Sequence, residues 1–169
     1  RVFTLVILSF VGWDAGELIM ISSKDPDIAL LGVRAIFAGV FLFPIFFFHF
    51  SFLFPQKLTR FLEGWRSLIL YVGPVALLVP FIVLLRVDIA RVLQIGAIFY
   101  YISSSKGPLE SSLLALVLAL IGLGCFSSGI VNFIISYRQT KITQQRLQIL
   151  YLLVGIIAMF VIGLVLQVA

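Results

Sequence analysis

Four residues could carry chemistry because they interrupt otherwise apolar segments: Trp13, Asp14, Glu17 and Arg34. Asp14 and Glu17 are three residues apart, which places their carboxylates on one face of a helix. Arg34 lies about two helical turns inside the next apolar segment, at a depth similar to that of Glu17. Ionisable groups are costly inside a bilayer, so we expect Arg34 to contact Glu17 or Asp14.

Three interpretations of this predicted contact are open. It can be a structural ion pair that satisfies Arg34, a polar pocket that opens outward and binds a ligand, or a relay for protons or ions. The pocket would contain Trp13, Asp14, Glu17 and Arg34.

The other polar residues form no catalytic or metal-binding pattern. The sequence has no P-loop, no G-x-S-x-G and no H-E-x-x-H motif. His49 is the only histidine and Cys125 the only cysteine, so a metal site would lack ligands. We therefore expect no catalytic residues, no metal, no cofactor and no enzyme activity in this chain.

The composition indicates a membrane protein. Hydrophobic residues make up 62% of the 169 residues and charged residues 11%, whereas a soluble domain is about half apolar and about a quarter charged. The net charge of +5 comes from basic residues spread thinly along the chain. It therefore does not indicate nucleic-acid binding, and the expected partner is the lipid bilayer.

Five apolar segments are long enough to cross a bilayer, which requires roughly 20 residues each. They cover residues 2–22, 28–54, 67–85, 109–137 and 147–168. The predicted fold is an all-α integral membrane protein, in which residues 1–169 form a single transmembrane domain built as a five-helix bundle. Asp27 is a candidate cap for the second helix.

The longest connection, over residues 86–108, is predicted to lie outside the cell. Its β-branched and aromatic run, residues 92–102, predicts a short extracellular hairpin or an interfacial loop. Lys and Arg number seven on the side that contains Arg1 and five on the other. The positive-inside rule then places Arg1 in the cytoplasm and Ala169 outside.

Two further features predict how the helices pack. Gly12 and Gly16 form a G-x-x-x-G motif, which lets helices approach closely. Asn132, inside the fourth apolar segment, is expected to form a hydrogen bond with a neighbouring helix.

Several of these residues also carry a family resemblance. The chain resembles the N-terminal seven-helix membrane sensor region of bacterial histidine kinases, related forms of which precede diguanylate cyclases. The resemblance rests on Trp13, Glu17, Arg34 and Pro44, on Lys106-Gly107-Pro108-Leu109, on Tyr137-Arg138, on Arg146 with Gln148, and on Gly155. The five segments correspond to the second to sixth helices of that region.

The resemblance implies a multi-pass protein of the bacterial cytoplasmic (inner) membrane that works as a homodimer. We therefore expect a sensor or receptor domain that detects a small-molecule or lipid ligand and signals to a cytoplasmic output domain outside this chain. The alternative is a non-catalytic accessory or structural subunit of a larger membrane complex. A small transporter is a third possibility, although the sequence contains no inverted repeat.

Overall fold

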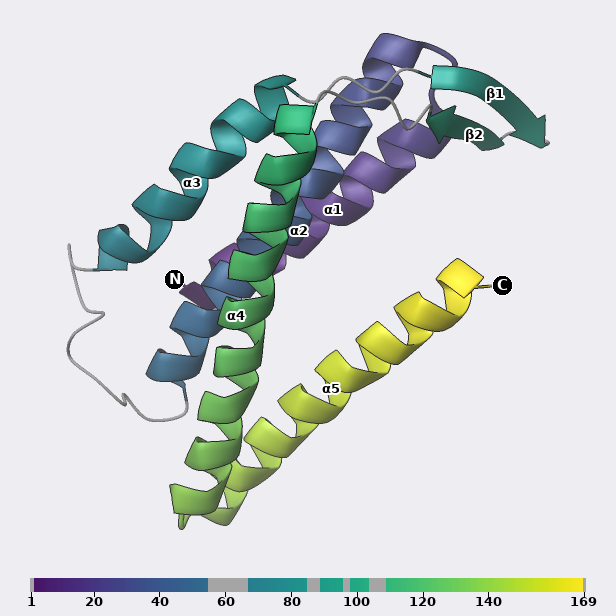
Figure 1. Cartoon of the computed structure of the whole chain (residues 1–169). Coiled ribbons are helices and arrows are strands. Elements are labelled where there is room, and N and C mark those ends of the chain that lie inside the picture. The colour runs from purple at the N-terminus through teal and green to yellow at the C-terminus, as the bar shows by residue number, and fades with distance from the viewer. Residues whose placement is uncertain (1, 55–66, 85–88, 96–97, 104–108, 169) are drawn as a thin grey trace.

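The computed structural model describes residues 2–54, 67–84, 89–95, 98–103 and 109–168. These residues form five helices and one two-stranded sheet (Figure 1). In chain order the elements are α1 (Val2–Ser22), α2 (Pro26–Leu53), α3 (Ser67–Leu84), β1 (Ile89–Ile95), β2 (Ile98–Ser103), α4 (Leu109–Gln139) and α5 (Thr143–Val168).

Three of the described helices are long and apolar enough to cross a membrane, namely α1, α2 and residues Leu113–Gln139 of α4. Helix α3 contributes a shorter apolar stretch, Leu70–Val83. Large apolar side chains are widely exposed on these helices; Leu18, Val83 and Leu123 are each more than 60% exposed. Such a surface suits a helical protein in lipid. The number of five spans stays a prediction.

A tight turn joins α1 to α2. Asp25 caps α2, because its side chain accepts a hydrogen bond of 2.9 Å from the backbone N–H of Asp27. Pro26 follows at the first helical position, where its lack of an N–H does no harm. The prediction that Asp27 is the cap is wrong. It lies in the first turn, where its negative charge complements the helix dipole.

Helix α2 is the centre of the molecule, because it packs against α1, α3 and α4. Its phenylalanines contribute to both hydrophobic clusters. The larger hydrophobic cluster consists of Val6, Phe43, Phe47, Phe133 and Ile149. The smaller cluster lies on the other side of α2, where Phe37 and Phe41 pack against Leu78, Phe81 and Leu118.

Helices α1 and α2 are in contact through their backbones. A Cβ atom added to Gly16 would lie 2.6 Å from the carbonyl oxygen of Gly32. One added to Gly39 would lie 2.5 Å from the carbonyl oxygen of Ser9. The small residues are seven apart on both helices, so two complete turns separate the two close contacts.

The predicted G-x-x-x-G motif is therefore only half right. Gly16 lies in this contact, but an added Cβ at Gly12 would meet no atom within 4 Å. The small residue that acts with Gly16 is Ser9, because residues seven apart return to nearly the same face of a helix.

The connection between α3 and α4 contains an antiparallel hairpin of β1 and β2. Its register pairs Val92 with Tyr101, Leu93 with Tyr100 and Ile95 with Ile98. Strand β2 lies against α1, so the hairpin is beside one end of the α1–α2 pair (Figure 1).

Helix α5 departs from the predicted bundle. It meets α4 near its own start, where Ile149 is buried against Phe133. Beyond that point the two helices separate, as Figure 1 shows. On the outer face of α5, Tyr151, Val154 and Ile157 are 54–70% exposed, whereas Leu152, Leu153 and Ile156 are half-buried against the cluster of Phe133 and Ile149.

Candidate functional site

The two acidic residues of the predicted site lie on the outer side of α1. Gly16 faces α2, and each residue of a helix is rotated about 100° from the one before it. Asp14, two residues before Gly16, is therefore on the opposite side of the helix, and Glu17 is turned away from α2. Both side chains are exposed.

Arg34 also points away from its predicted partners. It follows Gly32 by two residues, which rotates it about 200° from the contact with α1. The guanidinium Nε of Arg34 is buried without a hydrogen-bond partner. Among the described residues, no hydrogen bond or ion pair joins Arg34 to Asp14 or Glu17.

The predicted contact of Arg34 with Glu17 or Asp14 is thus not formed, although the three residues do lie at a similar depth, as predicted. Gly16 lies opposite Gly32, so Asp14, Glu17 and Arg34 share one height along the α1–α2 pair. The helix rotation could not be read from an isolated stretch of sequence, because it depends on which residues form the interface.

Trp13 is the one predicted site residue that faces the interior. Its backbone and Cβ lie against Gly39, because a Cβ added to Gly39 would lie 2.9 Å from the backbone N and 3.0 Å from the Cβ of Trp13. Its indole stacks with Phe10 at a centroid distance of 6.4 Å. These contacts hold the indole at the edge of a cavity between three helices.

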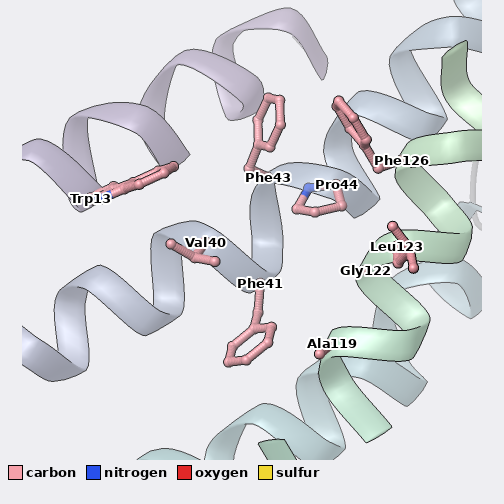
Figure 2. Close-up of a pocket in the computed structure, with 9 residues that line it drawn as sticks. All are labelled: Trp13, Val40, Phe41, Phe43, Pro44, Ala119, Gly122, Leu123 and Phe126. Atoms are coloured by element: carbon pink, nitrogen blue, oxygen red, sulfur yellow. The ribbon is translucent and has the colours of Figure 1, made fainter. Parts of the chain in front are cut away.

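The cavity has a volume of about 270 Å³. Its lining residues, drawn in Figure 2, come from the middle parts of α1, α2 and α4. The lining residues are Trp13 from α1, Val40, Phe41, Phe43 and Pro44 from α2, and Ala119, Gly122, Leu123 and Phe126 from α4.

The cavity has a buried floor and an exposed rim. Phe43 and Gly122 are buried, and a Cβ at Gly122 would be 3.6 Å from Cγ of Pro44, an ordinary contact. Ala119 and Leu123, one turn apart on α4, are exposed. The cavity is therefore open beside α4, toward the surroundings of the helices.

The lining determines which ligands the cavity can accept. The only polar side-chain atom that it offers is the indole Nε1 of Trp13, a hydrogen-bond donor. A charged ligand would lose its hydration without compensation. The cavity therefore suits an apolar ligand, and within the described part of the chain no three potential metal ligands come together.

Two polar contacts join α2 to its neighbours. The side-chain amide of Asn132 donates to the Ser51 hydroxyl at 3.1 Å, which confirms the prediction for Asn132. His49 is buried, and its Nδ1 shares a hydrogen bond with the Tyr71 hydroxyl of α3. Both contacts connect helices and leave the cavity without a further polar group.

Comparisons with protein-family models, with curated proteins and with solved structures each return no match. The geometry of the chain itself must therefore carry any functional assignment.

Sequence reasoning missed most of the cavity. Of the lining residues, only Trp13 and Pro44 carry a signal in the sequence, and Pro44 does so only through the family resemblance. A small residue on α4 opposite a proline of α2 leaves a space, but this pairing becomes visible only once the two helices are aligned.

Proposed function

We propose that this chain is a membrane sensor domain whose signal is the occupancy of the cavity between α1, α2 and α4. The observation that carries the proposal is the composition of the cavity walls. One wall belongs to the closely packed α1–α2 pair and the other to α4. A ligand between the two walls favours one distance between α4 and the α1–α2 pair over another, as a two-state receptor requires.

The packing of α4 provides a path from the cavity to α5. Phe126 lines the cavity, and Phe133, two turns further along the same helix, is fully buried against the Ile149 cluster. A displacement of α4 at the cavity therefore changes how α5 is held. Helix α5 in turn would pass the change to an output domain, such as a kinase or a cyclase.

The family resemblance supports the same site. Trp13 and Pro44 both contribute to the resemblance, and both line the cavity. A homodimer in the bacterial cytoplasmic membrane remains part of this proposal, because the resemblance implies it.

The test is to reconstitute the full-length protein that carries this chain and to measure its output activity with Gly122→Leu. The added side chain fills the cavity, since only ordinary contacts surround its Cβ. We expect the output to become fixed and insensitive to changes in lipid or added ligand. The matched control is Gly124→Leu, because Gly124 has no atom within 4 Å of an added Cβ. An unchanged response in Gly122→Leu would exclude the cavity as the sensor.

One observation favours the alternative of an accessory subunit. Asp14 and Glu17 are exposed near the middle of α1, where lipid would surround them. Carboxylates in that setting are costly unless another helix covers them. A subunit of a larger complex predicts stoichiometric co-purification with a foreign membrane protein, lost in Asp14→Asn/Glu17→Gln. Purification without any partner would count against this alternative.

A further inference from the structure

We propose that the cavity binds one acyl chain of a bilayer lipid, which enters sideways across the rim formed by Ala119 and Leu123. This inference deepens the proposed function. It rests on that function only because it takes the same cavity as the ligand site.

The position of the cavity selects this class of ligand. Trp13, Pro44 and Gly122 each lie near the middle of their helices. The hydrocarbon core of a bilayer is about 30 Å thick, so the acyl chains of either leaflet end near the middle. A membrane-spanning arrangement of the three helices therefore brings the cavity to the depth that acyl chains reach.

The size of the cavity also fits a chain segment. Its volume of about 270 Å³ exceeds the roughly 150 Å³ of an apolar cavity that holds benzene. It is smaller than the range of about 300–1,000 Å³ typical of sites that enclose drug-sized ligands. Part of a flexible chain can therefore occupy it while the rest of the lipid stays outside.

The rim allows this partial entry. Ala119 is exposed, and Leu123 is 64% exposed, so this side of the lining is accessible from outside the described helices. A polar headgroup would find no partner inside, apart from the indole N–H. An empty apolar cavity loses contacts along its whole lining, and acyl chains are the molecules at its opening. The walls therefore favour a lipid tail over water or an ion.

Tryptophan fluorescence can test this occupancy directly. The chain has two tryptophans, and Trp65→Phe leaves Trp13 as the only one. The protein is reconstituted in phosphatidylcholine vesicles in which an increasing fraction of the lipid carries bromine near the end of its acyl chains. Bromine quenches the indole on contact, so the emission of Trp13 reports a chain in the cavity.

We expect the brominated fraction that halves the Trp13 emission to be roughly threefold lower in the parent than in Gly122→Leu. The factor is small because the chain exchanges one apolar environment for another. Gly124→Leu should match the parent. If Gly122→Leu does not fold, Ala119→Leu, which narrows the rim, replaces it. Identical curves for the parent and the filled variants would overturn the proposal.

A second arm identifies the source of the chain. A free brominated fatty acid is added to vesicles of unbrominated phosphatidylcholine, and quenching by this probe alone would overturn assignment to a bilayer lipid. The assay needs no output activity. If quenching depends on Gly122 but Gly122→Leu leaves the output unaltered, only the proposed function is overturned. If Gly122→Leu alters the output but not the quenching, only the assignment of a lipid chain is overturned.

Discussion

The α1–α2 pair and the α4–α5 pair are built in opposite ways. In the first, glycines bring two backbones into contact at two levels, seven residues apart. In the second, contact centres on Phe133 and Ile149, and α5 then diverges with Tyr151, Val154 and Ile157 exposed. Both pairs are antiparallel helices joined by a short connection, so topology does not cause the difference.

The difference teaches where the chain can change shape. Backbones in contact have no intervening side chains that could rearrange, so α1 and α2 move together. Helix α4 is held to α2 through side chains such as Phe47 and Phe126, which can adopt other rotamers. The cavity lies between these two kinds of packing, and a ligand there would displace α4 rather than α1.

The largest expected effect is at the backbone contact of α1 and α2. Gly32→Leu should lower the free energy of unfolding by about 3 kcal/mol or more, because neither backbone can move without separating the pair. Denaturation with SDS in mixed micelles, followed by circular dichroism, measures this. Gly12→Leu is the control, since an added Cβ there meets nothing within 4 Å. Similar losses in both variants would contradict the close contact.

A smaller effect is expected at the contact of α4 with α2. A Cβ at Gly129 would lie 2.8 Å from the ring of Phe47, which is itself buried. A ring can shift where a backbone cannot, so Gly129→Ala should cost about 1–2 kcal/mol, toward the lower end of overpacking effects. The same denaturation assay applies, with Gly124→Ala as the control. Gly32→Ala serves as the comparison at the α1–α2 contact. A larger loss of unfolding free energy in Gly129→Ala than in Gly32→Ala would show that the α2–α4 contact is the less tolerant of the two.

The polar contact between α2 and α4 should contribute still less. Asn132→Ala removes the hydrogen bond to Ser51, and such contacts between membrane helices average about 0.6 kcal/mol. A double-mutant cycle with Ser51→Ala isolates the coupling energy. A coupling near zero would show that the contact does not hold α4 in place.

The smallest effect is expected on α5. An added Cβ at Gly155 meets no atom within 4 Å, so Gly155→Leu should change the free energy of unfolding by less than about 0.5 kcal/mol. A loss of about 1 kcal/mol or more would show that another helix covers this face, and that α5 is packed as firmly as α1.

The helices could be predicted from the sequence, but their rotations could not. Long apolar runs bounded by Pro26 or by the basic residues near Arg138 are local signals, and the helices follow these runs closely. The interface of α1 was assigned through Gly12 and Gly16, yet it contains Ser9 and Gly16. Two glycines four residues apart are easily recognised in a sequence. The seven-residue spacing of Ser9 and Gly16 indicates an interface only when it is matched with the same spacing of Gly32 and Gly39 on α2.

The same limit explains the candidate site. Counting residues from the ends of the two segments correctly placed Arg34 level with Glu17, because the depth of a residue depends only on the rise per residue of the helix. Their directions depend on two helix rotations, and both side chains are turned away from the α1–α2 contact. Trp13 was identified because it interrupts an apolar segment beside Asp14 and Glu17 and belongs to the family resemblance. The cavity beside it required the position of α4, which no local pattern encodes.

The spacing of small residues on α1 and α2 also has a consequence for biosynthesis. Both helices leave the ribosome before α4. Only the tight turn that contains Asp25, the N-cap of α2, separates α1 from α2. Their close contact needs no residue from later in the chain. The pair can therefore assemble as a helical hairpin during insertion, and the remaining helices then add to a surface that is already complete. A defect at Gly16 or Gly32 would accordingly appear as failed insertion and rapid proteolysis in the cell, before any loss of signalling could be measured.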